Sequence, residues 1–324
     1  MKKIKRYREL LIIAVLLLVF LVAALSQTKI PSPKLTNEKR VSLIVYGDDS
    51  ERWENLRQGA GLVCENNDAG LSLLTMLSEN DVAEQEEIIE REIENGADAL
   101  IIAPVNSAQI RDYIINRKIS IPVAFVESVE SCGKDQTDIA PDDYRMGYEL
   151  GEKLVENESD IVTVAVVSNN TERDSVALRE KGLMDAIEGK VGKILTWSRS
   201  EYNNKTETRV FIQKSLVSEA TDVIVTFDNS TTDALLDALT NLNKQSKQYS
   251  VSTSNKAVYN LYSREILSLG YPNEYAMGYL AAENVLDRSY AKKAYSDKEI
   301  EYRIIRKENM YDEDNQTLLF PFVN

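Results

Sequence analysis

The segment GADALIIAPVNSAQI, residues 96–110, decides the fold of this 324-residue chain. It starts at a glycine, continues through a short apolar run, and ends at the polar residues Asn106 and Ser107. An apolar run of this length between turn-forming residues is typical of a strand buried on both faces of a parallel sheet. Because ligands bind at the carboxyl ends of such strands, we expect Asn106 to contact a ligand. The alternative is that Ser107 merely caps the next helix.

A second segment, ATDVIVTFDNSTTDAL at residues 220–235, has the same pattern. An aspartate again precedes an apolar strand, which here ends at Asn229 and Ser230. Two copies of one strand-to-helix unit predict two similar α/β lobes whose polar strand ends face each other across a cleft. The alternative is a chance match, because buried strands draw on few residue types.

Composition and charge exclude several function classes. The chain is 43% hydrophobic and 28% charged, which is enough to form one or two domains with a substantial core. Its formal net charge of -14 argues against a nucleic-acid partner, whose phosphates require clustered lysine and arginine. The sequence contains no histidine, so serine-triad, papain-like and histidine-metal sites lack their key residue.

The amino-terminal residues 1–26 predict a signal-anchor or transmembrane segment. Several lysines and arginines precede an unbroken apolar run from Leu10 to Leu25. The basic end stays in the cytoplasm by the positive-inside rule, which places the rest of the chain outside the membrane. A retained anchor is favoured because the run is long for a signal peptide, and the alternative is cleavage before Gln27.

Residues 27–39 are expected to form a linker, because they are polar, contain two prolines and show no periodicity. The chain has two cysteines, Cys64 and Cys132. Cys64 lies in a segment with helical periodicity, which favours a buried free thiol over a disulfide with Cys132.

Strand and helix patterns alternate along the rest of the chain, which predicts a parallel sheet in each lobe. One helix is expected at residues 50–66, and another begins at the cap Asp81 and ends at Gly96. The remaining strands are expected at residues 41–46, 71–77, 121–128, 160–168, 193–197, 221–227 and 249–254.

Seven segments, taken together and in order, resemble the ribose-binding type of extracytoplasmic sugar-binding protein, in the periplasmic binding protein type I family. The resemblance covers nearly all of the chain after Lys39, and its order and spacing specify the fold better than the ligand. The segments are ERWENLRQGA (51–60), IIEREIENGADALIIAPVNS (88–107), IPVAFVES (121–128), PDDYRMGYELGEKL (141–154), RDSVALREKGLMDAI (173–187), VTFDNSTTDAL (225–235) and YAMGYLAAENVL (275–286).

The resemblance implies an α/β protein with two Rossmann-like lobes, each with a parallel sheet, joined by a three-segment hinge. It places the amino-terminal lobe at residues 40–141 plus 273–300. It places the carboxy-terminal lobe at residues 142–272 plus 301–324.

The resemblance also implies a sugar site between the lobes, with aromatic rings on the sugar faces and planar polar groups around its edge. The family's aromatic pair falls on Arg52 and Trp53, so an arginine replaces one aromatic residue. Trp53 is alternatively a core residue, and Arg179 is alternatively a solvated helix charge. The site residues expected in all are Ser50, Arg52, Trp53, Asn106, Glu127, Arg179, Tyr202, Asp228 and Ser254.

Two further positions depart from the pattern of sugar binders. Ser128 stands where sugar binders often have an arginine, and the late acidic position falls on Ser254 or Asn255. A pentose or hexose is the expected ligand, and another small polar molecule stays open. We expect no cofactor and no metal, and we expect the acidic residues 311–317 to be solvated rather than to bind calcium.

Three function classes compete for this fold. A repressor of the lac type is excluded because an apolar segment, not a DNA-binding motif, precedes the lobes. An enzyme is disfavoured because no nucleophile and base recur in a recognisable motif. A binding protein is therefore expected, and it needs a membrane partner that detects the closed lobes. A sensor histidine kinase is slightly favoured over an ABC permease, because an anchored chain suits a neighbour in the same membrane.

Overall fold

The computed structural model describes residues 38–48, 51–128, 137–158, 161–168, 172–199, 204–286 and 300–320. The predicted anchor at residues 1–26 lies outside the described residues, as do Ser50, Cys132, Tyr202 and most of the linker. Within the described ranges, no helix has both the length and the apolar character needed to span a bilayer. The described residues from Lys39 onward belong to one compact unit.

The first lobe is built on a five-stranded sheet with the strand order β2-β1-β3-β4-β5, in which every pairing is parallel. Its strands are β1 (Lys39–Ile44), β2 (Ala69–Leu74), β3 (Ala99–Ile102), β4 (Val123–Val126) and β5 (Thr137–Ile139). Its helices are η1 (Glu51–Trp53), α2 (Glu54–Asn66), α3 (Val82–Glu94), α4 (Ser107–Asn116) and, from later in the chain, α10 (Glu274–Leu286).

The second lobe is built on a six-stranded sheet with the order β11-β10-β9-β8-β6-β7, in which only the β10–β11 pairing is antiparallel. Its strands are β6 (Thr163–Ser168), β7 (Lys193–Ser198), β8 (Val223–Thr226), β9 (Lys247–Val251), β10 (Ile266–Pro272) and β11 (Tyr302–Ile305). Its helices are α5 (Asp143–Asn157), α6 (Asp174–Ile187), α7 (Lys205–Ser218), α8 (Asn229–Leu242), α9 (Asn255–Ser263) and α11 (Glu313–Leu319).

The two sheets share one topology. If β11 is set aside, the second sheet has the order β7-β6-β8-β9-β10, which repeats the order of the first. The strands β3 and β8 occupy the same central place, and each leads directly into a helix. The predicted fold class, an α/β protein with two mainly parallel sheets, is therefore confirmed, and the repeated segments are equivalent units rather than a chance match.

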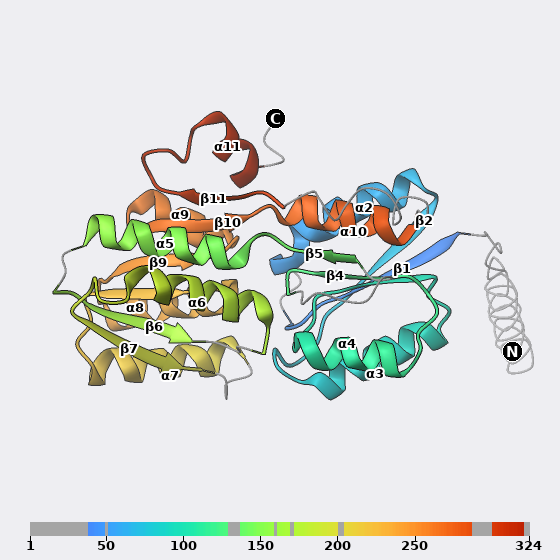
Figure 1. Ribbon diagram of the computed structural model, residues 1–324, viewed down its shortest axis with the longest axis horizontal. Coiled ribbons are helices and arrows are strands. Elements are labelled where there is room, and N and C mark those ends of the chain that lie inside the picture. Colours follow the sequence, from blue (N-terminus) through green and yellow to red (C-terminus); the bar gives the residue numbers. More distant parts are fainter. Residues whose placement is uncertain are drawn as a thin grey trace, which may run out of the picture. The chain divides into compact units, whose positions relative to one another are not determined.

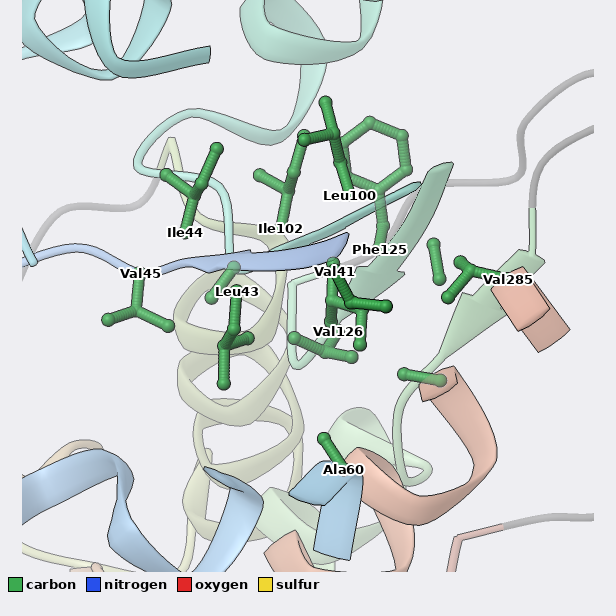
Figure 2. Packing of buried hydrophobic residues seen from close by; sticks show 14 of the residues in the cluster. Val41, Leu43, Ile44, Val45, Ala60, Leu100, Ile102, Phe125, Val126 and Val285 are labelled. Carbon is green, nitrogen blue, oxygen red and sulfur yellow. The ribbon is translucent and has the colours of Figure 1, made fainter. Parts of the chain in front are cut away.

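Helices cover both faces of each sheet (Figure 1), which explains why the strands are apolar on both sides. In the first lobe, α2 and α10 lie on one face and α3 and α4 lie on the other. Figure 2 shows Ile44 and Ile102 on one side of the sheet. It shows Leu43 on the opposite side, toward Ala60 of α2 and Val285 of α10.

Local sequence signals set several element ends. The Asp81 side chain accepts a hydrogen bond from the Glu84 amide at the start of α3, and Gly96 follows this helix with a φ of +82°. Both assignments are confirmed. Cys64 is a buried free thiol in α2, as expected. The strands β5, β10 and β11 were not predicted.

The chain crosses between the lobes at three places. It passes to the second lobe after Ile139, returns to the first lobe after Pro272, and passes again to the second lobe between Leu286 and Tyr302. These crossing segments pair with one another. Pro141 forms a parallel bridge with Ile300, and the Asn273 amide donates a 2.9 Å hydrogen bond to the Glu301 carbonyl.

Candidate functional site

A cavity of about 850 Å³ lies among segments of both lobes, within the size range of small-molecule sites. The first lobe contributes residues around Trp53 and Glu79. The second lobe contributes the residues that follow β8 and β9, around Asn229 and Thr253. Phe320, after α11, adds an apolar side chain. Most of the cavity wall therefore comes from the carboxyl ends of parallel strands, where α/β sheets bind ligands.

Two aromatic residues form one wall of the cavity. The rings of Tyr46 and Trp53 meet edge to face, with centroids 4.9 Å apart and an interplanar angle of 86°. The Trp53 indole donates a 3.1 Å hydrogen bond to the Tyr46 carbonyl, and Trp53 is only 1% exposed. Trp53 therefore has the buried core position that was the alternative to a ligand role, and it also lines the cavity. An aromatic wall of this kind suits the C–H face of a sugar.

Arg52, which replaces an aromatic residue of the family, both stacks on Trp53 and forms ion pairs. Its guanidinium lies 4.1 Å from the centroid of the Trp53 ring. The same guanidinium donates to Glu127 at 2.8 Å and to Glu274. Glu127 also accepts a 2.6 Å hydrogen bond from the Tyr46 hydroxyl. Arg52 therefore places a cation, shared by two carboxylates, on the floor of the cavity.

This ion-pair network continues into the second lobe through Arg179. The Arg179 guanidinium donates to Asp143 at 2.7 Å and to the Phe227 carbonyl at 2.9 Å, and it lies 3.9 Å from Glu127. Arg179 is 2% exposed, so the alternative of a solvated helix charge is wrong. Glu127 has a φ of +65°, a left-handed conformation that is rare outside glycine and is often found at functional sites.

Burial sets the protonation of this network. It raises the pKa of Asp143 to about 7, against the lowering effect of Arg179, and it raises the pKa of Glu274, against the lowering effect of Arg52. Burial also acts to raise the pKa of Asp228, but Arg199, Arg173 and hydrogen bonds from Thr231 outweigh it and hold that pKa below its usual value.

Direct hydrogen bonds join the lobes on either side of the cavity. Glu79 of the first lobe accepts a 2.6 Å hydrogen bond from Arg199 of the second lobe. The Ser128 and Ser175 hydroxyls are 2.6 Å apart, so the serine that replaces an arginine of the family forms a contact between lobes. The Ser107 amide donates a 2.9 Å hydrogen bond to the carbonyl of Glu172.

Three of the predicted site residues cap helices. Asn106, Asp228 and Ser254 are the N-caps of α4, α8 and α9, and each side chain accepts an amide hydrogen bond from the residue three positions later. The assignment of the α4 cap to Ser107 is therefore wrong, because Asn106 has that role. Asp228 and Ser254 line the cavity as well as capping.

Arg52 and Trp53 line the cavity directly, whereas Glu127 and Arg179 lie in the buried network behind Arg52. Ser50 and Tyr202 lie outside the described residues. Within the part of the chain that the structure describes, no group of three or more His, Cys, Asp or Glu side chains is arranged to hold a metal ion.

The structure adds residues to the site that the sequence analysis missed, namely Tyr46, Glu79, Arg173 and Arg199. Each of them lies between the end of a strand and the start of the following helix. That position was the available signal, because in a parallel sheet these connections border the ligand crevice. Three of the four are charged. A charged residue close to the end of an apolar strand is a further signal, because charged residues are rarely buried unless they are paired.

Comparisons with known proteins agree with this architecture. Residues 41–293 match a family described as the periplasmic binding protein domain. No curated protein sequence matches the chain.

Among solved structures, the chain is similar to a carbohydrate transporter solute binding protein from Agrobacterium radiobacter in complex with D-arabinose. The TM-score is 0.77 and the identity 18%, over 88% of this chain and 99% of that chain. It is also similar to an ABC transporter solute binding protein from Agrobacterium vitis with bound D-fucose, with a TM-score of 0.77 and 16% identity, over 86% and 99% of the two chains.

A further similar structure is that of the XylFII-LytSN complex, with a TM-score of 0.71 and 16% identity, over 84% of this chain and 98% of that chain. At these identities the likeness concerns the fold alone.

Proposed function

The chain belongs to the periplasmic binding protein domain family, and we propose that it binds a small sugar, a pentose or a hexose, between its lobes outside the cytoplasm. The observation that carries this proposal is the composition of the cavity. It combines the aromatic wall of Tyr46 and Trp53 with the polar side chains of Asp228, Asn229 and Ser254 at the opposite strand ends. A ring with C–H faces and a rim of hydroxyls matches both kinds of surface.

The proposed role is binding followed by closure of the lobes, without turnover of the sugar. A ligand that contacts both lobes binds the closed arrangement more tightly than the open one, so it shifts the equilibrium toward closure. The direct contacts of Glu79 with Arg199 and of Ser128 with Ser175 are available only when the lobes are together. The sugar and these contacts therefore stabilise the same state.

A membrane protein detects the closed lobes in this proposal. A sensor histidine kinase is favoured, because the predicted anchor at residues 1–26 would hold the chain beside a neighbour in the same membrane. The similarity to XylFII, which forms a complex with a second protein, LytSN, supports a role in a protein complex. If the amino-terminal segment is cleaved, the protein is secreted.

The second candidate is the solute-binding component of an ABC sugar transporter. The similar structures with D-arabinose and D-fucose are both described as transporter solute binding proteins, which favours this alternative. An enzyme on the same fold is the least favoured candidate.

Thermal unfolding of the full-length protein with a panel of pentoses, hexoses and polyols tests sugar binding. A sugar that binds only the folded state raises the unfolding temperature, by RT ln(1 + [L]/Kd) in free energy. A panel without any shift contradicts the sugar assignment. Crosslinking in native membranes, with and without the active sugar, then separates the partners: capture of a permease and no kinase refutes the sensor role.

A further inference from the structure

Among the described residues, the Arg173 guanidinium is a buried cation without a hydrogen-bond partner. Arg173 is the N-cap residue of α6, and its exposed fraction is 0%. None of its three guanidinium nitrogens has a hydrogen-bond partner among the described residues. Arg179, in the same helix, donates to Asp143 and to the Phe227 carbonyl. Buried polar groups in native proteins are nearly always paired, so an unpaired guanidinium requires an explanation.

Aromatic and acidic groups of the cavity surround this guanidinium. It lies 4.2 Å from the centroid of the Tyr46 ring, where cation–π attraction holds it. Carboxylates of Asp228, Glu79 and Glu127 compensate its charge through space. Tyr46, Glu79 and Asp228 all line the cavity, and Arg173, which is not one of the lining residues, lies behind them.

The neighbouring carboxylates bind other donors. Glu79 accepts from Arg199 and Ser230, and Glu127 accepts from Arg52 and Tyr46. The Asp228 carboxylate accepts from the amide and hydroxyl of Thr231. The Arg173 guanidinium, a planar group with five N–H donors, therefore lies close to the cavity. The carboxylates around it accept their hydrogen bonds from other residues.

We propose that Arg173 is a ligand-binding residue whose guanidinium donates to two neighbouring oxygen atoms of the bound sugar. This inference rests on the proposed function and names a determinant of its specificity. The planar fork of an arginine matches two adjacent acceptors, such as vicinal hydroxyls or a hydroxyl and the ring oxygen. These oxygens are uncharged in a pentose or a hexose, and each accepts a hydrogen bond through a lone pair.

Arg173→Met tests this role, with Arg179→Met as the matched control in the same helix. Two quantities are measured on the full-length chain in mild detergent. The first is unfolding by urea without sugar. The second is calorimetric affinity for D-arabinose, D-fucose, D-allose and D-glucose.

For Arg173→Met we expect a urea midpoint lowered less than that of Arg179→Met, because its guanidinium makes no hydrogen bond to the described residues, although nearby carboxylates compensate its charge. We expect at least a tenfold loss of affinity for the sugar that the wild type binds. For Arg179→Met we expect a clearly lower midpoint, because its loss leaves Asp143 unpaired.

Two results would overturn the inference. They are a midpoint for Arg173→Met as low as that of Arg179→Met and an unchanged sugar affinity. A wild type that binds no sugar refutes the proposed function instead. The urea measurement still separates the two arginines in that case, because a midpoint as low as that of Arg179→Met shows a structural role for Arg173.

Discussion

Glu79 of the first lobe lies 2.6 Å from Arg199 of the second lobe, and Arg199 is fully buried. The two residues are 120 positions apart in the sequence. Ser230 donates a second hydrogen bond to Glu79, and Arg199 also donates to Thr208. One carboxylate from the loop before α3 therefore joins two segments of the other lobe, which makes it a contact that opening of the lobes must break.

Glu79→Ala is expected to lower the free energy of unfolding by about 3 kcal/mol, because it leaves the buried Arg199 without its partner. Urea unfolding measures this change. Lys181→Ala, which breaks the exposed pair with Asp185, is the control and is expected to change stability by less than about 0.5 kcal/mol. Equal effects of the two substitutions would show that the Glu79 contact is not formed.

Glu79→Ala is also expected to increase the radius of gyration in small-angle X-ray scattering of the sugar-free protein. Loss of the contact shifts the lobes toward the open arrangement, and saturating sugar is expected to reverse part of the increase. An unchanged scattering profile would show that the contact between Glu79 and Arg199 does not hold the lobes together.

The buried Asp143 predicts a stability that falls as pH rises. Its pKa is raised to about 7 in the folded protein, whereas the unfolded chain has the ordinary value near 3.9. Between these values the folded state holds a proton that the unfolded state has lost. The free energy of unfolding therefore decreases by up to about 1.4 kcal/mol per pH unit.

Urea unfolding at pH 5, 6, 7 and 8 checks the Asp143 contribution. Above pH 5 the Asp228 carboxyl, whose pKa is lowered, is ionised in both states and adds no slope. Asp143→Asn is expected to reduce the slope below pH 7, and Glu274, whose pKa burial also raises, is expected to keep part of it. Asp142→Asn, at the neighbouring exposed cap of α5, is expected to keep the slope. A slope that Asp143→Asn leaves unchanged would assign it to another group.

Close packing of α2 against α10 predicts opposite effects for two glycines in one helix. A Cβ at Gly59 would lie 2.0 Å from the Tyr275 carbonyl oxygen, so Gly59→Ala must separate the helices and is expected to cost about 3 kcal/mol. A Cβ at Gly61 would meet only Leu71, at 3.9 Å. Gly61→Ala is expected to stabilise by up to about 1 kcal/mol through helix propensity. Thermal unfolding of both variants measures the contrast.

Trp53 is expected to contribute to the core as well as to the cavity. Trp53→Ala removes a buried ring that packs on Tyr46 and is expected to cost about 3–5 kcal/mol of stability. Trp53→Phe keeps an aromatic ring in the wall but loses the hydrogen bond to the Tyr46 carbonyl. This loss is expected to lower the free energy of unfolding by about 1 kcal/mol. Calorimetry on Trp53→Phe then isolates the role in sugar binding. An Ala variant of wild-type stability would contradict the core position.

Sequence by itself determined most of the elements and their arrangement into layers, but not the strands β5, β10 and β11. The apolar run that contains Ala99–Ile102 lies between a glycine and polar residues, and it forms a strand buried on both faces. Asp81 and Gly96 mark the two ends of α3. These signals are local, because a cap bonds to an amide three residues later and a buried strand needs an apolar run. The alternation of strand and helix then implies parallel sheets.

Only the tertiary structure decided how the polar strand ends are used. Asn106 caps a helix, Glu127 binds Arg52 and Tyr46, and Arg173 is left unpaired beside the cavity. All three are polar residues near strand ends, and the sequence pattern does not separate them. Their partners come from distant segments, and the free energy of a buried charge depends on the groups that the whole fold places around it.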